Sequence, residues 1–433
     1  MSKKGKKKSS FFKLLALFIL TVLVCAVSGF FFTGSIITFT PLKGWLQQLI
    51  DDNAGSKITF NSVSGTALRL TLHEVKITPT DESRNLKGLT AEKVSVTFEY
   101  EPLLQNILIL KTAHIQEGEI EYSLQSNDPT KLWASLPLDK ITTSKTNLHV
   151  HNVSGWKVDL LNAKLDLRSN GKPGDKNFLI AAAVKSEHVA IHKLKLEKLD
   201  ASVIIQPLHV EITDLKAKLG GGDLAVKATQ AYGASNEINQ LKVDLKKGDI
   251  GALLQELDYS SRFSGQVNLS MAADGMFTPK KKNLHGRGDF EISDVSVRVA
   301  MPKFPIHNDA PILLTMREIK NLKGKNSFVL EADKMITKGF DVENKNITLN
   351  GDQTVYYNKN ISGQWTLNTN KKIADGIPGV ARGIFAINEQ GGAIIPFGLD
   401  GTTANPSVNV DYVIEKAFKK HLNKLNPLKL FGK

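Results

Sequence analysis

The chain has 433 residues, of which 41% are hydrophobic and 23% are charged. This composition excludes a largely disordered chain and is enough for a sizeable core in one large or two ordinary domains. The single cysteine, Cys25, excludes a disulfide framework and a cysteine-based zinc site. Of the net charge of +13, residues 1–13 carry +6 and residues 415–433 carry +5, which leaves +2 for residues 14–414. The near-neutral body of the chain argues against a nucleic-acid partner.

The first predicted element is a membrane anchor over residues 14–34, which follows a basic cytoplasmic tail at residues 1–13. No charged residue occurs between positions 14 and 42, and about 20 apolar residues are enough to span a bilayer as a helix. The basic flank stays cytoplasmic, so the bulk of the chain is expected on the far side of the membrane. A cleavable signal peptide is the alternative. We favour the uncleaved anchor because the apolar run continues through Phe30, Phe31 and Phe32.

Residues 41–52 are predicted to form a short amphipathic helix. Pro41 stands at its start, and Leu42, Trp45, Leu46 and Leu49 lie along one side together with Ile50. Two interpretations of Trp45 fit equally: its ring sits at the membrane interface, or it covers the end of the folded domain.

From residue 57 to residue 410 the apolar residues recur with a period of two. Such alternation predicts antiparallel strands with one apolar and one wet face. We expect on the order of 25–30 strands, which at that length curl into a sandwich, a taco or a groove. The candidate lining of the apolar face is Val94, Val96, Phe98, Tyr100, Ile120, Tyr122, Leu124, Leu208, Val210 and Ile212.

Turns and helices are predicted at three further places. Gly220, Gly221 and Gly222 stand between two alternating segments, which indicates a hairpin turn. Asp249 is a candidate N-cap for a helix over residues 250–257. Residues 411–433 have apolar residues on one helical face and lysines on the other. This pattern fits a basic helix on an anionic membrane and equally a helix docked on the domain.

The sequence contains no motif for a phosphate loop, a dinucleotide site, a zinc protease or a nucleophile elbow. His149 and His151 share one face of a predicted strand, and His188 and His192 are four residues apart. No carboxylate or cysteine set at ligand spacing accompanies either pair, so we predict no metal site. We therefore expect no catalytic residues, no cofactor and no enzymatic activity; a secreted hydrolase is the weakest of the alternatives.

Three places in the chain resemble the AsmA family of bacterial envelope proteins, which is similar to the wider set of groove-shaped lipid-transfer proteins. The first is Pro41, Trp45 and residues 55–58, followed by residues 63–72 (VSGTALRLTL) and the stretch 89–124. The second joins residues 248–254 (GDIGALL), 263–269 (FSGQVNL) and 284–290 (LHGRGDF). The third joins residues 395–402 (IPFGLDGT) and 405–408 (NPSV). Typical members of the family are longer.

The resemblance implies an inner-membrane protein with a periplasmic β-groove over residues 57–410, linked to phospholipid movement and outer-membrane biogenesis. The fold class expected is mainly β: one transmembrane helix, a long antiparallel curled sheet, a few short helices and a C-terminal amphipathic helix. The expected function is to shelter and transfer phospholipid acyl chains, with membrane phospholipids, the inner membrane and an outer-membrane or periplasmic protein as partners. The alternative is a non-catalytic scaffold or chaperone-like factor for outer-membrane protein assembly, acting through exposed strand edges.

Overall fold

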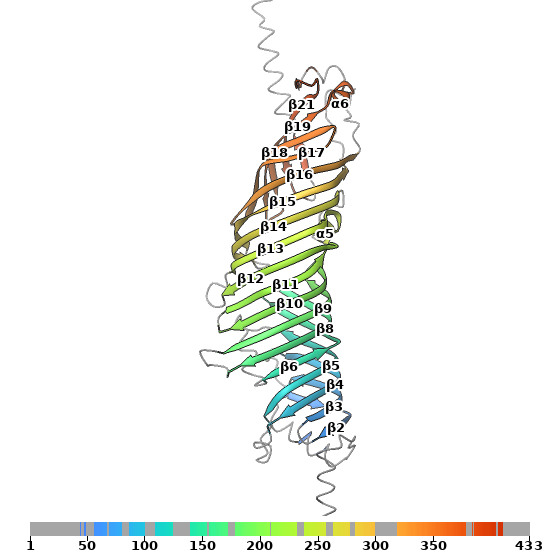
Figure 1. Cartoon of the computed structure of the whole chain (residues 1–433), viewed down its shortest axis with the longest axis vertical. Coiled ribbons are helices and arrows are strands. Elements are labelled where there is room, and N and C mark those ends of the chain that lie inside the picture. The colour runs from blue at the N-terminus through green and yellow to red at the C-terminus, as the bar shows by residue number, and fades with distance from the viewer. Residues whose placement is uncertain are drawn as a thin grey trace, which may run out of the picture. The chain divides into compact units, whose positions relative to one another are not determined.

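The computed structural model of the chain is mainly β, as the alternation predicts (Figure 1). It describes residues 44, 47–48, 56–66, 69–79, 86–99, 109–123, 139–153, 156–171, 178–207, 209–231, 238–256, 263–277, 282–298, 318–377, 383, 385–403 and 406–409. No helix within these ranges is long and apolar enough to cross a membrane. The predicted tail (1–13), anchor (14–34) and C-terminal helix (411–433) lie outside them. Of the predicted helix 41–52, residues 44, 47 and 48 are described, and all three are helical.

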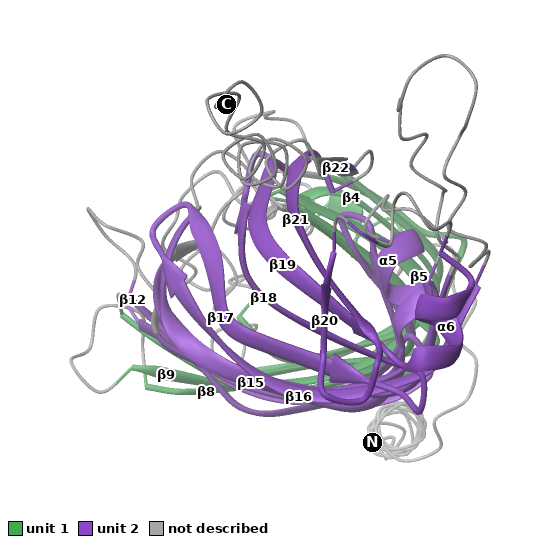
Figure 2. Ribbon diagram, turned by 90° about the horizontal axis from the view of Figure 1, so that it is seen from above, with its two compact units in different colours: residues 1–153, 157–187, 204–208 green, residues 154–156, 188–203, 209–433 purple. Residues whose placement is uncertain are grey.

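The chain divides into two compact units. Unit 1 comprises residues 1–153, 157–187 and 204–208, and unit 2 comprises residues 154–156, 188–203 and 209–433 (green and purple in Figure 2). Strands β9 (Leu179–Ile191) and β10 (Leu194–Gln206) contribute residues to both units.

Unit 1 contains the strands β1 (Ser56–Thr59), β2 (Ser62–Thr66), β3 (Arg69–Pro79), β4 (Leu86–Phe98), β5 (Leu110–Ser123), β6 (Lys140–Ser144) and β7 (Thr146–Val153), with nearly all of β8 (Trp156–Asn170). Its sheet is mixed, which corrects the expectation of a purely antiparallel one. The antiparallel pairs are β1–β3, β2–β3, β3–β4, β4–β5 and β6–β8. The pairs β5–β6 and β5–β7 are parallel. Parallel neighbours need a connection of a dozen or more residues, and residues 124–139 separate β5 from β6 in the chain.

Unit 2 is an antiparallel meander in chain order. Its strands are β11 (His209–Leu219), β12 (Gly222–Ala231), β13 (Ile238–Asp249), β14 (Phe263–Phe277), β15 (Lys282–Arg298), β16 (Glu318–Glu331), β17 (Lys334–Glu343), β18 (Ile347–Tyr356), β19 (Ile361–Thr369), β20 (Ala386–Ile387), β21 (Ala393–Gly401) and β22 (Pro406–Asn409). Its helices are α5 (Ile250–Glu256) and α6 (Lys371–Asp375). Each strand from β11 to β18 pairs with the next one along the chain, and β21 pairs with β19, β20 and β22.

Two local predictions are confirmed in unit 2. Gly220 and Gly221 form the two-residue loop of the β11–β12 hairpin, with φ angles of 53° and 74° that glycine adopts without strain. Asp249 caps α5, since its Oδ1 accepts a hydrogen bond from the N–H of Ala252 at 2.7 Å.

Several strands bend where one residue adopts a left-handed conformation. In three of them the N–H of that residue is bound by an Asn or Asp side chain on the neighbouring strand. Asn162 donates to Asn147 Oδ1 (3.1 Å), Lys247 to Asn268 Oδ1 (2.8 Å) and Gly339 to Asp352 Oδ1 (2.7 Å). Such bulges increase strand curvature, and Figure 2 shows the strands of unit 2 strongly bent.

Candidate functional site

The predicted lining residues of β4 and β5 come together in unit 1. Val94, Phe98 and Ile120 belong to one buried apolar cluster, and Val96 packs against it while remaining half-buried. Tyr122 is also buried, opposite Leu86 of β4. The cluster is completed by Phe60, Val63, Leu70, Leu72, Val75, Leu89, Ala91 and Ile115.

The strand register explains why these side chains meet. Val94 lies opposite Leu72 of β3 and Ile115 of β5, and Val96 lies opposite Leu70 and Ala113. Side chains of directly paired residues project from the same face of a sheet, so the period-two pattern in each strand becomes one apolar face.

The other predicted lining residues either lie outside the described residues or belong to unit 2. Tyr100, Leu124 and Leu208 lie outside the described residues. Val210 and Ile212 belong to β11 in unit 2, where both are half-buried and lie opposite Gln230 and Ala228.

Sequence reasoning missed a row of aromatic side chains in unit 2. The rings come from β15, β16, β17, β19 and β21 and are joined by centroid distances of 4.8 to 6.4 Å. Phe340 and Trp365 meet edge to face, and Trp365 and Phe397 are stacked. In order along the contacts, the row is Phe328, Phe290, Phe340, Trp365 and Phe397. Its members are buried or half-buried.

The signal that could have revealed the row is the placement of glycines opposite its rings. Gly288 lies opposite Phe328, and Gly351 lies opposite both Phe340 and Trp365. A Cβ at position 351 would be 2.8 Å from Cδ2 of Trp365, so the indole occupies space that only glycine leaves. Glycine in a strand often marks such a close approach. The pairing depends on the register between strands, which the sequence alone does not reveal.

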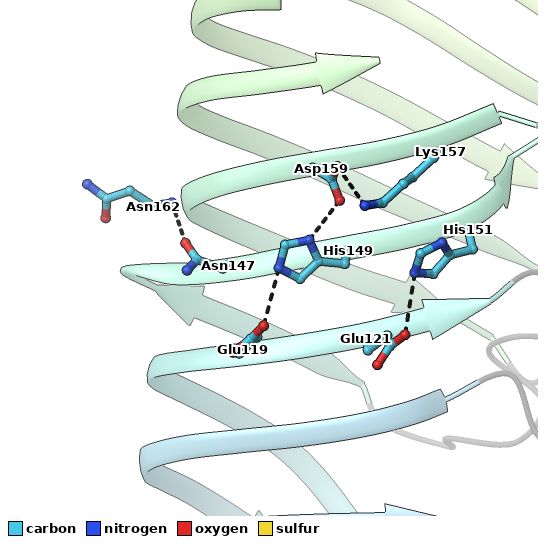
Figure 3. Close-up of polar contacts among 8 residues, drawn as sticks. All are labelled: Glu119, Glu121, Asn147, His149, His151, Lys157, Asp159 and Asn162. Carbon is cyan, nitrogen blue, oxygen red and sulfur yellow. Dashed lines mark hydrogen bonds and ion pairs between the residues drawn. The ribbon is translucent and has the colours of Figure 1, made fainter. Parts of the chain in front are cut away.

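The opposite face of unit 1 is polar and carries histidines next to carboxylates. Figure 3 shows His149 of β7 between Asp159 of β8 and Glu119 of β5. Its Nδ1 lies 2.7 Å from Asp159 Oδ1, and its Nε2 lies 3.5 Å from Glu119 Oε1. His151 lies on the same face of β7, with its Nε2 3.5 Å from Glu121 Oε1. The strand pairing thus supplies carboxylates that are distant from these histidines in sequence.

The electrostatics of this region have identifiable causes. Burial acts to raise the pKa of Asp159, but hydrogen bonds from His149 and Lys157 outweigh it and hold that pKa below its ordinary value. Burial, reinforced by the charge of Arg69, lowers the pKa of His114, which contacts Thr142 Oγ1 at 2.8 Å. Within the described part of the chain, no group of three or more His, Cys, Asp or Glu side chains could hold a metal ion.

An open depression of about 460 Å³ lies in the strands next to the histidines. Its lining includes four glutamates, at positions 74, 92, 117 and 119, together with Val75, Thr90, Ala91, Gly118 and Asn147. A lining with four carboxylates does not suit an acyl chain, because apolar ligands bind in sites lined mainly by apolar side chains. The depression therefore combines four carboxylates with Val75 and Ala91, which belong to the apolar cluster.

No protein family, curated protein sequence or solved structure matches the chain. What the structure establishes is the class: a mainly β protein of mostly antiparallel sheet with two short helices among its described residues.

Proposed function

We propose that the chain is a membrane-anchored protein that shelters the acyl chains of phospholipids on the apolar face of its sheet, without catalysis. The observation that carries the proposal is the clear separation of faces within each unit. In unit 1, the cluster around Val94 and Phe98 occupies one face, while histidines and glutamates occupy the other. In unit 2, the aromatic row occupies one face, and the alternate residues of the same strands, such as Asp289 and Asp341, are exposed.

The energetics favour a ligand that is itself apolar. Each CH₂ group removed from water contributes about 0.8 kcal/mol, so an acyl chain needs no specific polar contact to bind. Half-buried side chains such as Val96, Phe340 and Phe397 keep part of their surface available for contact. The aromatic rings add large, rigid apolar area at low entropic cost.

In this proposal the activity lies beside the inner membrane, facing the periplasm, and serves outer-membrane lipid homeostasis; the resemblance to the AsmA family and the predicted anchor at residues 14–34 support this part of it. Phospholipids and the inner membrane are the proposed partners, together with an outer-membrane or periplasmic protein.

The experiment that tests the proposal is site-specific photo-crosslinking in the full chain, in a bacterial membrane. A photo-reactive residue is introduced at Val96 or Phe340, and matched controls carry it at Thr97 or Asp341, the next residues on the opposite faces of the same strands. Mass spectrometry then identifies the adducts. We expect phospholipid adducts at the first pair of positions and none at the controls.

Phospholipid adducts at all four positions, or at none, would contradict the proposal. Adducts to polypeptide at Val96 and Phe340 would instead support the alternative, a scaffold for outer-membrane protein assembly. Circular dichroism of each purified variant confirms that the strands remain folded.

A further inference from the structure

Strand β7 occupies an unusual position in unit 1. It pairs in parallel with β5 through only five residue pairs, from Glu119 and Asn147 to Ser123 and His151. Parallel pairing is slightly less stable per residue than antiparallel pairing. Lys145, with a φ of 48°, lies between β6 and β7 and interrupts the strand just before this pairing begins. Side-chain contacts between β7 and its neighbours therefore contribute more to the stability of the sheet here than in the antiparallel meander of unit 2.

His149 is the side chain that connects β7 to both of its neighbours. Asp159 of β8 is an ionised carboxylate and only accepts hydrogen bonds, so Nδ1 of His149 carries the proton that it donates at 2.7 Å. In the neutral ring, Nε2 then presents a lone pair to Glu119 Oε1 at 3.5 Å, which forms no hydrogen bond. A second proton, on Nε2, converts this contact into a charge-assisted N–H···O⁻ interaction. One proton therefore decides whether His149 binds β5 as well as β8.

His151 repeats the arrangement one step along the strand. In both pairs the histidine contacts the glutamate two residues before its register partner on β5: His149 contacts Glu119, and His151 contacts Glu121. The remaining charge beside His149 is Lys157 of β8, whose Nζ lies 3.2 Å from Asp159 Oδ2 and is thus occupied by that carboxylate. The charged groups facing the two histidines from β5 and β8 are therefore mainly carboxylates.

The exposure of these groups sets the size of the effect. His149 and Glu119 have side-chain exposures of 25% and 64%, against 35% and 57% for His151 and Glu121. Ion pairs of partly buried groups are screened less than exposed ones. The two contacts are similarly exposed, but His149 also binds Asp159 of β8, so we expect it to contribute more than His151.

We propose that His149 and His151 act as a proton-operated clamp on β7, which tightens the β5–β7–β8 seam when both rings are protonated and loosens it when they are neutral. The histidine side chain is suited to this role because it changes charge between about pH 5 and pH 8. The clamp is independent of the proposed lipid-binding function, since it lies on the polar face of unit 1.

Hydrogen exchange of the full chain in detergent micelles tests the clamp. The measured quantity is the protection factor of the β7 amides (Thr146–Val153) at pH 5.5 and at pH 7.5, each relative to an unstructured peptide at the same pH. We expect protection to be roughly three- to tenfold higher at pH 5.5 in the natural chain. His149→Gln should abolish most of this rise.

Glu119→Gln is the second variant, because it leaves the hydrogen bond between His149 and Asp159 in place and removes the negative charge that strengthens the contact with the protonated Nε2. It should lose the rise to a similar extent, even where His149→Gln disturbs folding. His209→Gln is the matched control: His209 lies on β11 opposite Ala231, and this variant should keep the full rise. Equal protection at the two pH values in the natural chain, or a full rise in Glu119→Gln, would overturn the proposal.

Discussion

Trp365 of β19 lies directly across from Gly351 of β18, with its indole over the glycine backbone. The same ring is stacked on Phe397 of β21 and meets Phe340 of β17 edge to face. A single residue thus connects four neighbouring strands of unit 2 through its packing, and the absence of a Cβ at position 351 is what makes room for it.

Gly351→Ala should destabilise unit 2 by about 1–3 kcal/mol, the usual cost of overpacking. The added Cβ would lie 2.8 Å from Cδ2 of Trp365 and 2.5 Å from the carbonyl oxygen of Gln364, so the ring or the backbone must shift. Urea denaturation measures the change. Gly88→Ala is the control, because nothing lies within 4 Å of a Cβ at position 88 of β4, and it should change stability by less than about 1 kcal/mol.

Truncation of Trp365 should separate the roles of its ring and its N–H group. The indole nitrogen is buried and has no hydrogen-bond partner among the described residues. Trp365→Ala should cost about 3–5 kcal/mol, since it removes the ring from a buried site. Trp365→Phe keeps an aromatic ring and removes the unsatisfied donor, so its cost should stay below about 1.5 kcal/mol. A loss in Trp365→Phe as large as in Trp365→Ala, seen by thermal unfolding, would contradict this account.

Asn326 is a buried polar residue on the apolar face of β16, and its amide binds the backbone of Asp341 in β17. Its Oδ1 accepts from the N–H of Asp341 at 2.5 Å, and its Nδ2 donates to the carbonyl of Asp341 at 3.2 Å. Asn326→Leu leaves both backbone groups without these partners and should cost about 2–4 kcal/mol. Asn326→Asp keeps the acceptor only. It also introduces a charge at a buried site and sets an acceptor against the carbonyl of Asp341, so denaturant unfolding at pH 7 should show a loss at least as large as that of Asn326→Leu.

His114 should make unit 1 less stable on acidification. Burial and Arg69 lower its pKa below 6.5, so the folded state holds this ring neutral while the unfolded chain takes up a proton. The contribution of His114 is therefore complete above about pH 6.5 and declines as the pH falls toward its folded-state pKa. His114→Gln should reduce the loss of stability between pH 7 and pH 5, measured by thermal unfolding. An unchanged pH dependence in this variant would show that other groups are responsible.

The sequence by itself determined the strands, the β11–β12 hairpin and the cap of α5. Alternation at Val94, Val96 and Phe98, the glycines at 220 and 221, and Asp249 are local signals, because each acts within a few residues of the backbone that it shapes. The apolar cluster around Val94 follows from the same alternation once the strands pair.

Only the tertiary structure decided which strands became neighbours and in what register. The parallel return of β6 and β7 beside β5 placed His149 between Glu119 and Asp159, and the register of β18 against β19 placed Trp365 over Gly351. Alternation with a period of two shows which face of the sheet a side chain occupies, but it does not show which residue lies opposite on the neighbouring strand. That choice depends on chain crossovers and bulges, whose free energy is set by contacts between residues far apart in sequence.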